Sequence, residues 1–168
     1  MQKIIFIHGL ESSGQGFKGK YLKSIFTDIL TPDFKKFDYN IPIYHLFEER
    51  MNELNKFLAP TKHWVIIGSS FGGLMGAFYT LRNSEKVNKL ILLAPFLTFR
   101  NLNFSSCKAV DVPAIAFHGI NDNVVPYKSS HEIAKLLFTN LEYNIVDDDH
   151  SLHHTVKVIN WLELVLNI

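Results

Sequence analysis

The sequence has a single cysteine, Cys107, among its 168 residues, so no disulfide bond can form within the chain. It also has no run of roughly 18 apolar residues, the length that a membrane-spanning helix needs. The apolar segment at the N-terminus, residues 4–7, is shorter than the core of a signal peptide and no small-residue cleavage site follows it. We therefore expect a soluble, cytoplasmic protein with no membrane partner.

The charged residues are scattered and nearly balanced. Lys and Arg total 17 and Asp and Glu total 16, which gives a formal net charge of +1. Without a basic stripe, binding to a nucleic acid or another polyanion is not expected. Hydrophobic residues make up 47% and charged residues 20% of the chain, a balance typical of a folded globular protein. The length predicts one domain over residues 1–168, while the oligomeric state is left open.

Short apolar segments alternate with longer segments of helical periodicity. Strands are expected over 3–8, 34–39, 63–68, 88–94, 113–118 and 141–147, and helices over 17–30, 45–58, 71–83, 127–139 and 152–166. This alternation predicts an α/β protein: a three-layer α/β/α sandwich around a mostly parallel sheet of about six strands. Residues 95–112 lack a clean period and are expected to form a short connection or a minimal cap.

The stretch Gly68-Ser69-Ser70-Phe71-Gly72 matches the pattern Gly-x-Ser-x-Gly, with Ser70 at its centre. An apolar strand precedes it and a helical segment follows it, which is the context of a nucleophile elbow. In that turn the strand bends sharply into the helix and the glycines avoid steric clashes. The alternative is a helix that starts with small residues so that it can approach the sheet closely.

A serine nucleophile needs a base, and the base needs an orienting acid. Asp122 follows the expected strand 113–118, and His150 follows the expected strand 141–147. Both positions lie at the carboxyl ends of parallel strands, the same edge of the sheet as Ser70. We favour His150 as the base, while His153 and His154, one turn into the last helix, remain alternatives.

An oxyanion needs preorganised N–H donors. We assign the backbone amides of Phe71, at the start of its helix, and Leu10, in the loop after the first strand. His8 is expected to shape that loop rather than to take part in chemistry.

Four motifs in this order resemble the α/β-hydrolase superfamily, and within it the small bacterial serine esterases with a minimal lid or none. They are the strand-His-Gly-x loop, Gly-x-Ser-x-Gly-Gly, "HGINDNVVP" and Asp-His-Ser-Leu. The resemblance implies a minimal α/β-hydrolase fold, a triad of Ser70, His150 and Asp122, and hydrolysis of a carboxylic ester or related acyl bond of a small substrate. The leading strands and the full lid of larger members are missing.

Loops at the same edge predict the substrate pocket, with walls from Glu11, Phe96, Leu97, Val124 and Val125. No cofactor is expected. The acidic and histidine residues at 147–154 do not have the spacing of a common metal motif, so no metal site is expected either. Other functions remain open: a binding protein without turnover, a thioesterase, and transfer of an acyl group to an acceptor other than water.

Overall fold

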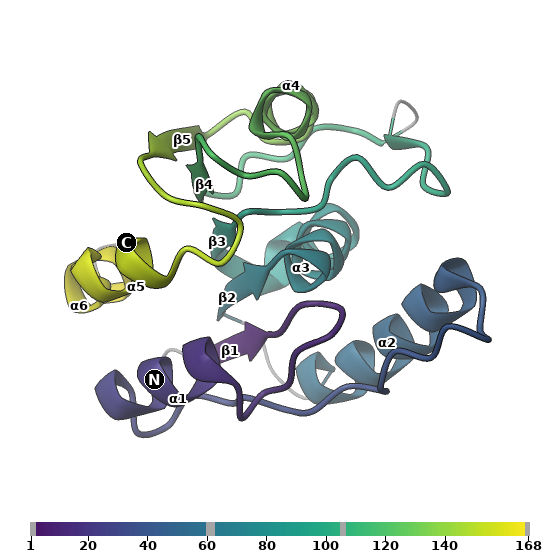
Figure 1. Ribbon diagram of the computed structural model, residues 1–168, viewed down its shortest axis with the longest axis horizontal. Coiled ribbons are helices and arrows are strands. Elements are labelled where there is room, and N and C mark those ends of the chain that lie inside the picture. The colour runs from purple at the N-terminus through teal and green to yellow at the C-terminus, as the bar shows by residue number, and fades with distance from the viewer. Residues whose placement is uncertain (1–2, 60–62, 105–106, 167–168) are drawn as a thin grey trace.

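Five parallel strands form the sheet in the computed structural model, which describes residues 3–59, 63–104 and 107–166 (Figure 1). The strands lie side by side in chain order: β1 (Lys3–Ile7), β2 (Trp64–Ser69), β3 (Val87–Leu93), β4 (Ala114–Gly119) and β5 (Leu141–Val146). Every neighbouring pair is parallel. The carboxyl ends of all five strands therefore meet at one edge of the sheet.

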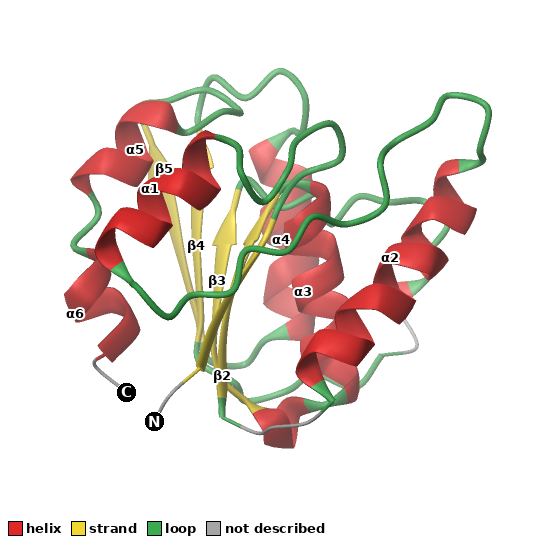
Figure 2. Ribbon diagram, turned by 90° about the horizontal axis from the view of Figure 1, so that it is seen from below, coloured by secondary structure: helices red, strands yellow, loops and turns green. Residues whose placement is uncertain are grey.

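Helices cover both faces of the sheet (Figure 2). They are α1 (Phe17–Ile25), α2 (Ile43–Leu58), α3 (Phe71–Arg82), α4 (Tyr127–Leu137), α5 (His153–Val158) and α6 (Trp161–Leu166), with a 3-10 turn at Ser84–Lys86. One hydrophobic cluster joins the sheet to α2, α3 and α4, and a second joins its other face to α1, α5 and α6. The predicted three-layer α/β/α arrangement is confirmed.

The strand β2 is apolar because both of its faces are covered. All six of its residues are buried. Trp64 and Ile66 pack into the first cluster, whereas Val65 and Ile67 pack into the second. A strand that is covered on both faces has no position left for a solvated side chain.

The strand expected over 34–39 is absent, so the sheet has five strands instead of about six. Two backbone amides of this segment form hydrogen bonds with side chains and not with a strand. Phe34 N–H donates to His8 Nε2 at 3.0 Å, and Lys35 N–H donates to Glu53 Oε2 at 2.9 Å. The place beside β1 is instead taken by a single parallel bridge between Ile5 and Leu30. Residues 34–38 have no regular secondary structure and residue 39 lies in a turn, so the prediction of a strand here was wrong.

Two expected helices differ from those observed. The helix expected over 17–30 ends at Ile25, since Phe26 is extended and the chain turns toward the bridge at Leu30. The helix expected over 152–166 is divided into α5 and α6 because Ile159 adopts an extended conformation, with φ −59° and ψ 131°.

The segment 95–112 contains no α-helix or strand in its described part, residues 95–104 and 107–112, apart from a single bridge between Val110 and Phe138. Its apolar side chains Leu97, Phe99 and Val112 are buried in the first cluster. The described part of the segment therefore lies on the core as an irregular connection.

Two glycines let α3 approach the sheet closely enough to bend directly out of β2. A Cβ at Gly72 would lie 2.1 Å from the carbonyl oxygen of Ile7, and one at Gly68 would lie 2.5 Å from the oxygen of Gly72. Both contacts are with backbone atoms, which cannot rotate away. The glycines of the Gly-x-Ser-x-Gly pattern are therefore required by this crossing.

Replacement of Gly72 by Ala is expected to lower the free energy of unfolding by about 1–3 kcal/mol, because the new methyl group forces α3 away from β1. Helix propensity alone predicts the opposite sign, since Ala is favoured over Gly in a helix. Urea unfolding followed by circular dichroism measures the change. Gly9→Ala is the matched control, because its Cβ would meet only ordinary contacts at 3.6 Å; equal stabilities of the two variants would contradict the close crossing.

Candidate active site

Ser70 lies at the turn from β2 into α3, in a conformation that L-residues rarely adopt. Its φ is 52° and its ψ is −114°. The turn is held by the neighbouring strand, since Ser70 N–H donates to Leu93 O at 2.9 Å and Phe96 N–H donates to Ser70 O at 3.0 Å. Strain of this kind costs roughly 1–3 kcal/mol and occurs mostly at functional sites. The turn has the geometry of a nucleophile elbow.

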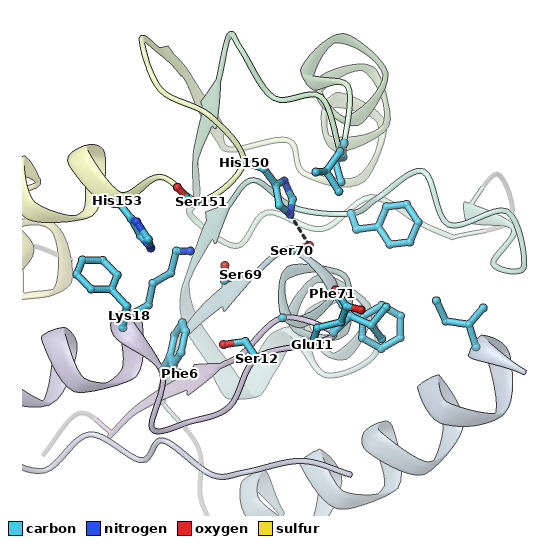
Figure 3. A pocket seen from close by; sticks show the side chains of 17 residues that line it. Phe6, Glu11, Ser12, Lys18, Ser69, Ser70, Phe71, His150, Ser151 and His153 are labelled. Carbon is cyan, nitrogen blue, oxygen red and sulfur yellow. Dashed lines mark hydrogen bonds between the residues drawn. The ribbon is translucent and has the colours of Figure 1, made fainter. Parts of the chain in front are cut away.

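His150 lies between Ser70 and Asp122. Its Nδ1 is 2.7 Å from Asp122 Oδ2. Its Nε2 is 3.0 Å from Ser70 Oγ, the contact drawn as a dashed line in Figure 3. Because a carboxylate only accepts hydrogen bonds, Nδ1 carries the proton and Nε2 is left to accept from the serine hydroxyl. The loop between β5 and α5 supplies His150, as the sequence predicted.

The two rival histidines lie on α5 and do not contact Ser70 in the described structure. The ring of His153 lines the same pocket, but it packs against Phe17 with 4.4 Å between ring centroids. His154 is exposed and is not part of the pocket wall. The structure therefore brings His150, and not its neighbours, to the serine.

Asp122 is buried in the turn after β4. Burial alone would raise the pKa of its carboxyl group. Hydrogen bonds donated to Oδ1 by the amides of Val125 and Val124, at 2.8 and 2.9 Å, together with His150, outweigh burial and hold the pKa below its ordinary value. The group is therefore a carboxylate at neutral pH.

A second histidine, His118, contacts the same carboxylate and was not identified as a site residue from the sequence. It is fully buried at the end of β4, with Nε2 at 3.0 Å from Asp122 Oδ2 and 2.9 Å from Val125 O. Both are acceptors, so Nε2 carries the proton and Nδ1 accepts from the hydroxyl of Tyr143 at 2.6 Å. Asp122 Oδ2 thus receives hydrogen bonds from two imidazoles, His150 and His118.

The sequence does contain a signal for His118. The strand endings "IIFIHG" and "AIAFHG" repeat, and this repeat predicts only two tight His-Gly turns. In the structure His8 also uses both ring nitrogens: Nδ1 donates to Gly9 O at 2.8 Å and Nε2 accepts from Phe34 N–H. The prediction that His8 shapes its loop agrees with these bonds.

A buried arginine of α2, Arg50, forms hydrogen bonds with the loop after β1. Arg50 donates to Gly9 O at 3.2 Å and to Leu10 O at 2.8 Å. Burial lowers the pKa of its guanidinium to about 10, which keeps it charged at neutral pH. The amides of Leu10 and Phe71, the two expected oxyanion donors, form no hydrogen bond within the described part of the chain. Sequence reasoning missed Arg50, whose position on an amphipathic helix gives no sign of a buried role.

A pocket of about 600 Å³ opens above Ser70 and His150. Four of the five predicted wall residues line it: Glu11, Phe96, Val124 and Val125. Leu97 does not, and this prediction was wrong. The chain turns between Pro95 and Leu97, so that Phe96 faces the pocket while Leu97 is buried in the core and lines a separate cavity. Residues that were not predicted also line the pocket, among them Phe17, Lys18 and His153.

Within the residues that the structure describes, no cluster of three or more His, Cys, Asp or Glu side chains has the arrangement of a metal site. Over the same residues, no helix combines the length and hydropathy that crossing a membrane requires.

Comparison with known proteins gives one family and a set of similar folds. The model of the alpha/beta hydrolase family matches residues 34–154. No curated protein sequence matches the chain. A proposed hydrolase of the alpha/beta superfamily from Xanthomonas campestris superposes with a TM-score of 0.82 at 22% identity, covering 100% of both chains.

Two further structures have the same fold. Est1E from Butyrivibrio proteoclasticus, solved with ferulic acid bound, has a TM-score of 0.77 at 13% identity. The match covers 99% of this chain and 89% of the Est1E chain. Mouse alpha/beta hydrolase domain-containing protein 10 has a TM-score of 0.74 at 17% identity, covering 98% of this chain and 90% of the mouse chain.

The two buried histidines predict how stability depends on pH. Burial lowers the pKa of both His8 and His118 below 6.5. Below that pH the unfolded chain binds protons that the folded protein does not, so stability is fully present above about pH 6.5 and is lost as the pH falls toward the folded pKa values. We expect the free energy of unfolding in urea to fall between pH 7 and pH 5.5.

The variant His118→Gln, which cannot titrate, is the control for this prediction. It is less stable at pH 7 because hydrogen bonds are lost, but its stability is expected to change less with pH than that of the wild type. Equal pH dependence in both proteins, or greater stability of the wild type on acidification, would contradict the neutral state of His118.

Proposed function

The chain belongs to the alpha/beta hydrolase family, and from this premise we propose that it is a serine hydrolase that cleaves a carboxylic ester, or a related acyl bond, of a small substrate. The observation that carries the proposal is the continuous set of contacts from Ser70 Oγ through His150 to Asp122, at 3.0 and 2.7 Å. These distances are within the range that proton transfer to a general base requires.

In the proposed first step His150 Nε2 takes the proton of Ser70 as Oγ attacks the substrate carbonyl carbon. The imidazolium that forms lies against Asp122, whose low pKa keeps it negative, so the positive charge is stabilised where it develops. Asp122 does not accept the proton in this scheme. Its role is to hold the tautomer and the orientation of the ring.

The carbonyl oxygen becomes an oxyanion during the attack. The amides of Leu10 and Phe71 are the proposed donors, because neither has another acceptor in the described structure and both line the pocket beside Ser70. Preorganised donors of this kind lower the barrier by about 3–4 kcal/mol each in hydrolases. Arg50 would act through the loop by fixing the carbonyls of Gly9 and Leu10 on the opposite side of the backbone.

The tetrahedral intermediate collapses when His150 gives its proton to the leaving oxygen and the carbon–oxygen bond to the alcohol breaks. Ser70 is then acylated. Water enters, His150 removes one of its protons, and attack on the acyl carbon releases the acid and restores the serine hydroxyl. Every proton taken by His150 is returned, so the enzyme ends in its starting state.

Substrate size follows from the pocket. Its volume of about 600 Å³ is in the range of small-molecule sites, and Phe96, Val124 and Val125 give it an apolar wall. We propose short or compact acyl groups. In the described part of the segment 95–112, Phe96 is the residue that lines the pocket. The ferulic acid bound to Est1E is an example of a small aromatic acid held by a protein of this fold.

Ser70→Ala is expected to reduce kcat for 4-nitrophenyl acetate by at least about 1,000-fold, because the nucleophile is removed while the fold and pocket remain. A fluorophosphonate probe is expected to label the wild type and not the variant, with the modified peptide mapping to Ser70 and not to the adjacent Ser69.

Ser129→Ala on the exposed face of α4 is the matched control and retains both activity and labelling. Folded wild type that neither hydrolyses esters or thioesters nor reacts with the probe would overturn the proposal and favour a binding protein. Activity of Ser70→Ala close to that of the wild type would also overturn it.

A further inference from the structure

Lys18 is a cation in the pocket wall that the proposed chemistry does not use. It is the second residue of α1, and it is the one Lys or Arg among the described residues that line this pocket. Figure 3 shows its side chain extending from α1 toward the side of the pocket that holds Ser151 and His153. The cation therefore faces the same space as Ser70 and His150.

Among the described residues, the ammonium group of Lys18 has no direct partner. Lys18 forms no hydrogen bond or ion pair with the residues that the structure describes, and its side chain is half-buried. Burial lowers its pKa, and the nearby charges of Asp149 and Asp148 offset this only in part. A cation that is partly desolvated and has no protein partner forms a strong charge-assisted hydrogen bond with an anionic ligand group.

The two nearby carboxylates are already engaged elsewhere. Asp148 Oδ2 accepts from the amide and the hydroxyl of Thr155, at 2.9 and 2.8 Å. Asp149 Oδ1 accepts from the amide and the hydroxyl of Ser151. Asp148 is fixed by α5 and Asp149 by the loop before it, so both carboxylates act on Lys18 through space and leave its donors free for a ligand.

The other charged group of the pocket lies apart from Lys18. In Figure 3, Glu11 and Phe71 are on one side of Ser70, and Lys18 and His153 are on the other. Glu11 Oε1 is also engaged, because it accepts from Tyr39 Oη at 2.9 Å. Lys18 therefore lies on the side of the pocket away from Glu11, where Phe17 and His153 also form the wall.

We propose that Lys18 is a specificity residue that binds a carboxylate carried by the substrate, so that the preferred substrates are anionic esters and not neutral ones. The inference rests on the proposed hydrolase function, and it adds the class of substrate. The carboxylate can belong to the acyl part or to the alcohol part of the ester, because both extend from the carbonyl carbon at Ser70.

Two pairs of substrates separate these sources. For the acyl part, the 4-nitrophenyl monoester of glutaric acid is compared with its carboxamide analogue, which has the same shape and no charge. For the alcohol part, 4-acetoxybenzoate is compared with 4-acetoxybenzamide. The measured quantity is the ratio of kcat/KM for the anionic and the neutral member of each pair.

In at least one pair the wild type is expected to favour the anionic member. Lys18→Met is expected to lower kcat/KM for that member about tenfold or more, the value of one charge-assisted hydrogen bond, and to change the neutral member less than about twofold. Lys18→Arg is expected to retain the preference. Lys20→Met, on the exposed face of the same helix and outside the pocket, is the control and keeps the wild-type ratio.

Unchanged ratios in Lys18→Met for both pairs, with that variant folded as judged by its thermal unfolding, would overturn the proposal. If the wild type hydrolyses none of these esters and the fluorophosphonate probe does not label Ser70, the proposed function is overturned instead. In that case, NMR titration with glutarate and with the uncharged glutaramide still decides the role of Lys18. Glutarate binding that Lys18→Met weakens tenfold supports the role, and equal binding of both compounds to both proteins refutes it.

Discussion

The arrangement of the site depends on the hydrogen bonds that the buried carboxylate of Asp122 accepts. A charge removed from water must be hydrogen-bonded, and each bond that satisfies it also fixes the group that donates it. Its two oxygens receive bonds from the turn after β4, from His118 at the end of that strand and from His150 in the loop after β5. The orientation of His150 toward Ser70 is thus set by a network that begins in the sheet.

The other half of the site depends on close approach of backbones. Gly68 and Gly72 have no room for a side chain, and the resulting sharp turn holds Ser70 at a positive φ. The strain is sustained because the strand pairing of β2 with β3 continues up to Ser69, and Ser70 itself is bonded to Leu93. Packing of the sheet thus supplies the energy that keeps the serine in an unfavourable conformation beside His150.

Much of the fold, and the positions of the three site residues in it, could be predicted from the sequence because they depend on local patterns. Apolar segments bounded by His-Gly or Gly-x-Ser turns indicate buried parallel strands, and parallel strands bring Ser70, Asp122 and His150 to one edge regardless of the details between them. The five observed strands and the three-layer arrangement were predicted from the alternation of apolar and helical segments, which also predicted a sixth strand over 34–39 that is absent. The roles of these residues in catalysis remain proposals.

The remaining features depend on contacts between segments that are distant in the chain, which local patterns do not contain. The segment 34–39 has the composition of a strand, yet its amides bond to His8 and Glu53. Leu97 is as apolar as Phe96, but the direction of the turn at Pro95 decides which of them enters the pocket. Arg50, from its position in a helix pattern, could equally have been a solvated residue.

The way in which the loop after β1 is held has a consequence for how the chain tolerates sequence change. Hydrogen bonds between strands use backbone groups, which every substitution except proline leaves in place. The segments around Gly9 and Lys35 depend instead on the side chains of His8, Arg50 and Glu53. The sheet can therefore vary wherever apolar volume is kept, whereas these three polar positions have few acceptable replacements. The helix α2 is constrained twice, by its own packing in the first cluster and by the loop contacts of Arg50 and Glu53.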